Sequence, residues 1–170
     1  MKNLKIVFQK DNKKIIEFKP RLFKLVLVET DNMYFKKWIR FLLAYIYGSK
    51  FYYLLENDDV VGYLMIEKGN KWRYDFASSN DIIAGPIFIK SQYRGKKYSE
   101  LLLRIGLEYY NKEYNYQKAF AYIWRTNIAS NKLFLKVGFS IVAQLKVRKI
   151  SRRIFISDQN QMYQLFELKV

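Results

Sequence analysis

Histidine and cysteine are both absent from this sequence of 170 residues. Their absence excludes a Ser-His-Asp triad, a Cys-His dyad, a Cys/His zinc site and a histidine general base within the chain. Disulfides are excluded as well, so nothing in the sequence indicates an oxidising compartment. The chemistry that remains is that of carboxylates, tyrosines, lysines and backbone groups.

Proline, glycine and long apolar runs are also scarce. The sequence has 2 prolines and 7 glycines and no Ser/Gly-rich linker, which predicts a single domain over residues 1–170. Its longest strongly apolar uncharged stretch, residues 41–47, is far shorter than the ~20 residues that cross a bilayer. Residues 1–10 are charged and lack the apolar core of a signal peptide. We therefore expect a cytoplasmic protein with no membrane partner.

Acidic residues are few relative to basic ones. Lys and Arg total 31 against 15 Asp and Glu, a net charge of +16. One interpretation is a polyanionic partner, such as a nucleic acid or a phosphorylated ligand. The other is that lysine simply keeps the protein soluble, because net charge bears on solubility and encounter rather than on fold.

The pattern of apolar residues predicts a mixed fold. Two β-rich runs, 51–55 and 60–66, flank the polar segment 56–59 and should form an antiparallel hairpin. The other expected strands are 4–8, 14–18, 23–28, 81–90 with an interruption at Gly85-Pro86, 119–124, 140–148 and 162–169. The expected helices are 33–47, 98–109 and 129–137, the last ended by Gly138. Such a mixture is typical of an α/β (α+β) sandwich, with helices on a largely antiparallel sheet.

One strand leads through a basic turn directly into a helix. Ile87-Phe88-Ile89 is followed by Gln92 to Lys97 and then by the helix from Tyr98. The first turn of a helix has unpaired N–H groups and a partial positive charge, which favour phosphate. Three cations, Arg94, Lys96 and Lys97, add charge at the same place. The segment predicts an anion site, with an ordinary solvated turn as the alternative.

A second motif follows the next expected strand. Asn127-Ile128-Ala129-Ser130 opens a helix that ends in Gly138-Phe139. Together with Gln92-x-x-Gly95 upstream, this motif resembles the GNAT superfamily of N-acetyltransferases, and the resemblance is clear from Gly85 to Phe139. It implies a mixed, mostly antiparallel sheet of six to seven strands with helices on both faces. It also implies a splayed cofactor cleft between the fourth and fifth strands, here 81–90 and 119–125.

The resemblance further divides the chain and assigns roles. Residues 1–50 would be a variable N-terminal region, 51–139 the cofactor-binding core and 140–170 a C-terminal strand pair. The co-substrate would be acetyl-CoA, with no metal. Backbone groups of Ile87, Phe88 and Ile89 would pair with the pantetheine arm, Asn127 would contact it, and Phe134 would line the thioester end. The amides that would cradle the pyrophosphate belong to Gln92, Tyr93, Arg94, Gly95, Lys96, Lys97, Tyr98 and Ser99.

Two positions depart from the family pattern. Lys97 stands where the family has Gly or Ala. Because φ is negative in the first turn of a right-handed helix, we expect lysine to be tolerated there and its ammonium to reach a phosphate. Phe134 stands where many members have a tyrosine that protonates the departing thiolate. Tyr122, Tyr163 or water would then supply the proton.

Three carboxylates are candidates for the general base: Glu67, Asp75 and Asp81. A carboxylate near the cleft could deprotonate an ammonium acceptor directly or through water. We favour Asp81, because it opens the strand that borders the expected cleft. The alternative for each is an ordinary surface carboxylate.

A basic cluster, Lys146, Arg148, Lys149, Arg152 and Arg153, lies near the C-terminus. Strand alternation holds up to Arg148, and the apolar positions then change from odd to even at Ile150, which predicts a bulge or turn near Lys149. The cluster is either a charged edge strand that prevents aggregation or a docking surface for an anionic acceptor.

These observations predict an acetyl-CoA-dependent N-acetyltransferase. The acceptor amine would attack the thioester directly while backbone N–H groups stabilise the developing oxyanion. We expect the acceptor to be a small anionic primary amine, such as a nucleotide-linked amino sugar. The alternatives are a protein N-terminus, an aminoacyl-tRNA, or a catalytically inactive basic binding module that retains the fold. A homodimer formed through the C-terminal strands is a further expectation, and nucleic acid is a less favoured partner.

Overall fold

The computed structural model describes residues 4–21, 35–148, 153–157 and 161–169. The chain forms two compact units. Unit 1 comprises Met1–Glu67 and Pro86–Tyr109, and unit 2 comprises Lys68–Gly85 and Tyr110–Val170. The anion-binding segment predicted around Gln92–Lys97 therefore belongs to unit 1, and the helix that begins near Asn127 belongs to unit 2.

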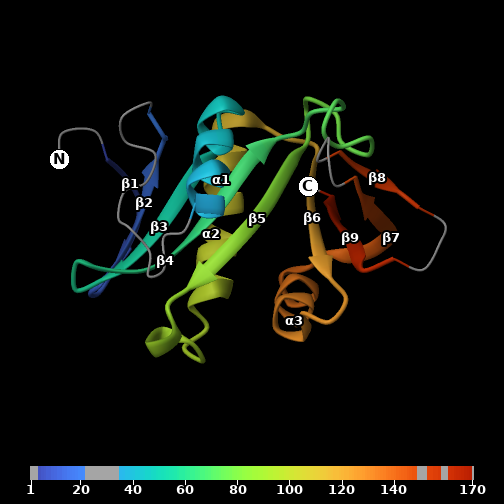
Figure 1. Ribbon diagram of the computed structural model, residues 1–170. Helices are drawn as coiled ribbons and strands as arrows, with labels where there is room; N and C mark the ends of the chain where they lie inside the picture. The colour runs from blue at the N-terminus through green and yellow to red at the C-terminus, as the bar shows by residue number, and fades with distance from the viewer. Residues whose placement is uncertain (1–3, 22–34, 149–152, 158–160, 170) are drawn as a thin grey trace. The chain divides into compact units, whose positions relative to one another are not determined.

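The described residues contain nine strands and three α-helices (Figure 1). The strands are β1 (Lys5–Lys10), β2 (Lys13–Phe18), β3 (Lys50–Glu56), β4 (Asp59–Lys68), β5 (Ile82–Ile89), β6 (Lys118–Trp124), β7 (Ser140–Val147), β8 (Ile154–Ile156) and β9 (Tyr163–Lys169). The helices are α1 (Phe35–Ile46), α2 (Tyr98–Tyr114) and α3 (Ile128–Val137), with a short 3₁₀ helix at Ser91–Tyr93. None of these helices is both long and apolar enough to cross a membrane.

The strand order is β1-β2-β3-β4-β5-β6-β9-β7-β8. Neighbouring strands pair antiparallel from β1 through β4, and so do β6 with β9, β9 with β7, and β7 with β8. Strands β5 and β6 pair in parallel. The expected mixed, mostly antiparallel class is confirmed, whereas the expected count of six to seven strands is wrong. The N-terminal segment folds into an additional hairpin, β1–β2, and the chain after β7 turns back to form the short β8.

Most expected elements are confirmed, with ends that differ by a few residues. The hairpin forms as β3 and β4, and Asn57 and Asp58 adopt the positive φ that a tight turn between twisted strands requires. The expected strand 23–28 lies outside the described residues, as does the start of the helix expected from residue 33.

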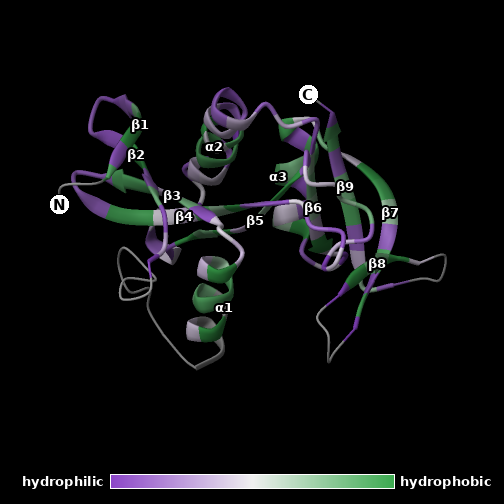
Figure 2. Ribbon diagram, turned by 90° about the horizontal axis from the view of Figure 1, so that it is seen from above, coloured by the Kyte–Doolittle hydropathy of each residue, from purple (hydrophilic) through white to green (hydrophobic). Residues whose placement is uncertain are grey.

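Unit 1 sandwiches its strands between two helices. Odd positions of β3 and β4 face α1: Phe41 packs on Phe51 and Tyr63, with ring centroids 5.5 and 6.2 Å away. Even positions face α2, where Gly106 lies against Leu64 and Tyr52. Figure 2 shows α1 and α2 on opposite sides of β3 and β4. The period-2 alternation of each strand thus supplies an apolar surface to both layers.

Unit 2 also packs both faces of its strands. On one face, Phe166 of β9 contacts Phe134 of α3, with ring centroids 6.1 Å apart. The other face carries a second cluster, which includes Tyr74, Phe120 and Leu145. Helices on both faces of the sheet were expected, and in unit 2 the segment around Tyr74 takes the place of a second helix.

Candidate functional site

Close approach of two strands positions the segment Ile87–Ile89. A Cβ atom at Gly62 of β4 would lie 2.2 Å from the carbonyl oxygen of Phe88, so only glycine fits there. The Lys90 N–H donates to the Val61 carbonyl oxygen at 2.9 Å. The final residues of β5 are therefore held firmly along β4, immediately before the basic turn.

The turn and the start of α2 present a row of unpaired donors. The backbone N–H groups of Gly95 to Ser99 donate to no acceptor within the described residues, and the Leu101 N–H is the first to bond back, to Lys97 at 3.1 Å. Gly95 and Lys97 have positive φ, 82° and 60°, on either side of Lys96. Residues of alternating handedness turn successive N–H groups to one side, which forms an anion-binding nest. The residues present therefore fit a pyrophosphate.

The conformation of Lys97 corrects one expectation. We expected a negative φ, and the structure has +60° because α2 begins only at Tyr98, which leaves Lys97 as the capping residue before it. A left-handed conformation costs an L-residue about 1–2 kcal/mol. The Lys97 ammonium makes no ion pair or hydrogen bond among the described residues, and it lies at the positive end of the helix. A bound phosphate would offset this unfavourable charge.

Replacing Lys97 by glycine tests two contributions of this residue: the backbone strain of its positive φ and the charge that it offers to acetyl-CoA. We expect Lys97→Gly to raise the free energy of unfolding by about 1 kcal/mol, because glycine adopts positive φ without strain. The same change should weaken acetyl-CoA binding about 5-fold, since one exposed cation near phosphate contributes about 1 kcal/mol. Urea denaturation and calorimetry measure the two effects.

The control is Lys97→Ala, which removes the charge but keeps the strained Cβ. It should weaken binding equally without the gain in stability. If both variants gain stability, the cause is removal of the charge from the helix N-terminus, and backbone strain is not the reason.

Glu56 anchors the start of α2 to the end of β3. The Tyr98 hydroxyl donates to Glu56 Oε1, and Lys96 Nζ lies 3.9 Å from Glu56 Oε2. The hydrogen bond to Glu56 raises the pKa of Tyr98 to about 12. Arg94 Nε donates to the Ile89 carbonyl oxygen at 3.2 Å. Two of the three predicted cations thus bind the protein itself, which leaves Lys97 for a ligand. Sequence reasoning missed Glu56, because no local pattern links it to a tyrosine 42 residues away.

In unit 2, the second motif builds the two ends of α3. Asn127 Oδ1 accepts a hydrogen bond from the Ser130 N–H at 3.2 Å and caps the helix. Its side-chain NH₂ group donates to nothing within the described part of the chain. Gly138 ends the helix with φ of 114°, and the Phe139 N–H donates to the Phe134 carbonyl oxygen at 3.1 Å. The motif is therefore structural at both ends, with one amide donor left for a ligand.

Phe134 lies in the core of unit 2. Its side chain is 2% exposed, and its ring centroid is 5.0 Å from that of Phe139. The two tyrosines proposed to replace the missing hydroxyl lie elsewhere. Tyr122 pairs with Leu165 and Phe166 pairs with Ala121, so Tyr122 and Phe134 contact opposite faces of β6 and β9. The Tyr163 ring lies 6.1 Å from Tyr122 on that other face.

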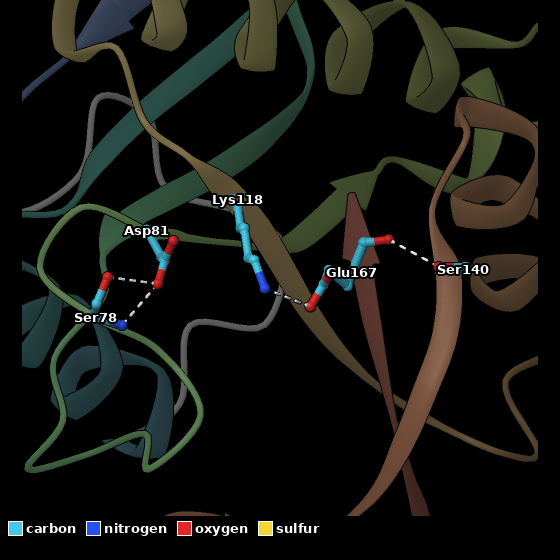
Figure 3. Close-up of polar contacts among 5 residues, drawn as sticks. All are labelled: Ser78, Asp81, Lys118, Ser140 and Glu167. Carbon is cyan, nitrogen blue, oxygen red and sulfur yellow. Dashed lines mark hydrogen bonds and ion pairs between the residues drawn. The ribbon is translucent and has the colours of Figure 1, made fainter. Parts of the chain in front are cut away.

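The three candidate bases each have a partner in the fold. Asp81 is 6% exposed, and its Oδ2 accepts from the Ser78 N–H at 2.8 Å and the Ser78 hydroxyl at 2.6 Å (Figure 3). Asp81 Oδ1 accepts nothing within the described residues. Glu67 is 2% exposed and accepts from the Ser49 hydroxyl at 3.5 Å. Asp75 is exposed and accepts from the Ile156 N–H at 3.3 Å. Two of the three are therefore buried, contrary to the surface alternative.

The strands expected to splay are β5 and β6. They pair in parallel at Ile82–Ala119 and Ile83–Phe120, near the start of each strand. Gly85, with φ of 127°, and Pro86 follow in β5, and proline has no N–H to donate. The two strands therefore pair near their starts, and their splay and the cofactor slot beyond this pairing stay predictions.

Comparisons with known proteins agree on one family. A model described as the acetyltransferase (GNAT) family matches residues 19–139. The chain resembles ribosomal-protein-S5-alanine acetyltransferase from Vibrio fischeri, with TM-score 0.62, 9% identity and 95% of each chain covered. It also resembles a putative acetyltransferase from Salmonella typhimurium solved with acetyl-CoA, with TM-score 0.56, 20% identity, and 85% of this chain and 75% of that one covered.

A third similar structure is an N-acetyltransferase from Staphylococcus aureus, with TM-score 0.56, 21% identity, and 85% and 82% of the two chains covered. No curated protein matches the chain significantly. At these identities the structural similarities show a shared fold, and the match to the family model covers more than two thirds of the sequence.

Proposed function

The chain belongs to the GNAT family of acetyltransferases, and we propose that it transfers the acetyl group of acetyl-CoA directly to a primary amine of a small anionic acceptor. A nucleotide-linked amino sugar is an acceptor of this kind. The observation that carries the proposal is the row of N–H groups from Gly95 to Ser99, which, like the ammonium of Lys97 beside it, have no partner among the residues that the structure describes. Donors in this arrangement suit a pyrophosphate.

The other cofactor contacts are those that the resemblance to the family implies. The backbone of Ile87, Phe88 and Ile89, held along β4 at Gly62, would pair with the extended pantetheine arm. The unused NH₂ group of Asn127 would donate to a pantetheine carbonyl. Acetyl-CoA supplies the thioester, whose thiolate is a fair leaving group because the pKa of a thiol is near 8.5.

We assign the general base to Asp81. Ser78 holds Oδ2 with two hydrogen bonds, which orients the carboxylate and leaves Oδ1 to accept a proton from the acceptor ammonium (Figure 3). Phe134 has no proton to give, so the departing thiolate would take its proton from water. Chemistry of this type requires neither histidine nor cysteine, in accord with the composition.

The net charge supports an anionic acceptor. At +16 the protein would repel a polyamine and attract an acceptor that carries phosphate. A second candidate is a protein N-terminus, which is favoured by the structural similarity to the ribosomal-protein-S5-alanine acetyltransferase. An aminoacyl-tRNA acceptor would also suit the charge.

Two measurements test the proposal in sequence. Acetyl-CoA at 100 times its Kd should add about 2.7 kcal/mol of stability and raise the Tm by about 5–10 °C. Acetylated pantetheine without phosphates is the control and should shift the Tm less. A panel of amines, assayed by release of free thiol, then identifies the acceptor.

The outcomes separate the alternatives. Turnover with nucleotide-linked amino sugars supports the proposal. Turnover only with peptides or aminoacyl-tRNA would show that the acceptor is a macromolecule of the alternative class. Binding without thiol release for any amine indicates an inactive module. Absence of a shift with millimolar acetyl-CoA contradicts cofactor binding altogether.

A further inference from the structure

Three members of the basic cluster, Lys146, Arg148 and Arg153, lie on one face of the β7–β8 hairpin, and the other two, Lys149 and Arg152, lie outside the described residues. Lys146 pairs with Phe155 and Val147 pairs with Ile154. Because side chains alternate along each strand, Lys146, Arg148 and Arg153 share one face with Phe155. All three cations are exposed, whereas Leu145 and Ile154 on the other face are 0% and 3% exposed. The bulge or turn predicted near Lys149 lies outside the described residues, and the antiparallel pairing of β7 with β8 places these three cations on the same face.

Protection of a sheet edge does not account for these cations. β8 is last in the strand order, yet its outer edge is already bonded. The Ile154 N–H donates to the Arg73 carbonyl oxygen at 2.8 Å, and the Asp75 N–H donates to the Ile154 carbonyl oxygen at 3.2 Å. The Asp75 carboxylate accepts from the Ile156 N–H. The edge is therefore closed to a further strand, which also argues against a dimer formed by pairing at β8.

The surroundings of this face extend its positive charge. In the sequence, residues 146–153 hold five cations and no acid, and two of these cations, Lys149 and Arg152, lie outside the described residues. The loop that closes the edge adds exposed Lys71 and exposed Trp72, the latter 61% exposed. The Arg148 guanidinium lies 5.5 Å above the ring of Phe155. Asp75 is the nearby acid, and its carboxylate is bound to the backbone of β8.

From these observations we propose that the outer face of the β7–β8 hairpin binds a single-stranded nucleic acid. Lys146 and Arg148 are about 7 Å apart along the strand, and Arg153 lies on the neighbouring strand about 5 Å away. One phosphate can engage two of them at most, whereas a polymer can engage all three. A guanidinium that lies over an aromatic ring offers a surface on which a base can stack.

A membrane surface fits this face less well. Interfacial binding needs large apolar side chains among the cations. On this face the described apolar side chain is Phe155, which is half-buried beneath Arg148, and the neighbouring loop adds one exposed aromatic residue, Trp72, rather than a group of apolar side chains among the cations. The surface is proposed irrespective of which amine the protein acetylates, and it therefore goes beyond the proposed function.

Fluorescence anisotropy with a labelled oligouridylate of about twelve nucleotides tests this surface. The variant Lys146→Gln/Arg148→Gln/Arg153→Gln should bind about 100-fold more weakly at 0.1 M salt, and its log–log salt slope should fall by about 2, since each lost phosphate contact contributes about 0.7. The matched control is Lys10→Gln/Lys68→Gln/Lys169→Gln, which removes equal charge from exposed positions outside the hairpin. The control should change binding less than 5-fold.

Three results would overturn the proposal. The wild type does not bind the oligouridylate, the two triple variants lose the same amount of binding, or the hairpin triple variant loses binding to phosphatidylserine vesicles while its RNA binding stays intact. Circular dichroism checks folding, and if the triple variant unfolds, each single Gln variant should still weaken binding about 5-fold. The acetyl-CoA thermal shift is measured on the same samples. If RNA binding depends on the hairpin but acetyl-CoA gives no thermal shift, the RNA-binding proposal is supported and the proposed function is contradicted.

Discussion

Replacing Phe134 by alanine should lower the free energy of unfolding by about 3–5 kcal/mol, the usual cost of truncating a buried phenylalanine. The ring is 2% exposed and packs against Phe139 and Phe166, both of which are themselves buried. Removal of the ring therefore leaves a cavity between α3 and β9 that the surrounding side chains cannot fill. Urea denaturation followed by circular dichroism measures the loss.

The control lies on the same helix. Ile128 is 58% exposed, and Ile128→Ala should change stability by less than about 0.5 kcal/mol. A loss below 1 kcal/mol for Phe134→Ala would mean that the ring does not belong to the core. Phe134→Tyr adds a test of the chemistry at this position: a hydroxyl that reaches the leaving thiolate raises kcat, whereas one buried without a partner lowers only stability.

Replacing Asp81 by asparagine should lower kcat about 10²–10⁴-fold, the range that a general base contributes. Asparagine keeps an oxygen that accepts from the Ser78 N–H and hydroxyl, so the turn that closes before β5 is retained. Stability and the acetyl-CoA thermal shift should therefore stay near the wild-type values. Thiol-release kinetics with the best acceptor of the panel measure the effect.

Two variants control this experiment. Asp81→Ala removes the acceptor for both Ser78 donors and should also lose about 1–3 kcal/mol of stability. Asp75→Asn changes an exposed carboxylate on the same unit and should keep its activity. Unchanged kcat in Asp81→Asn would show that Asp81 only closes the turn, and Glu67→Gln would then be the next variant to assay.

Much of the fold was predictable because it depends on local patterns. The β3–β4 hairpin follows from two apolar runs around a polar turn, and α3 follows from a capping asparagine and a terminal glycine. The exposed N–H groups around Gly95 were predictable for the same reason, since a helix that starts after a basic turn exposes its first N–H groups, and anion binding there stays a prediction. The count of six to seven strands was wrong because it was taken from the family resemblance, whereas the apolar pattern had already predicted the strands 4–8 and 14–18 that pair as β1 and β2.

The site itself was only partly predictable. The sign of φ at Lys97 depends on whether α2 begins at residue 97 or 98, and helix boundaries are not encoded to that accuracy in periodicity. The role of Glu56 requires β3 and α2 to meet, which no spacing along the chain expresses.

By itself, the sequence determined which chemistry is excluded, which family motifs are present and where a basic turn leads into the start of a helix. These properties reside in residue types and in short spacings. Only the tertiary structure decided that Asp81 is buried with one free oxygen, that Phe134 is a core residue, and that three cations share one face of the β7–β8 hairpin. The burial of a side chain and the face of the sheet on which it lies depend on pairing between segments that are distant in the sequence. Hydrogen-bond register and side-chain packing are set where these strands and helices meet.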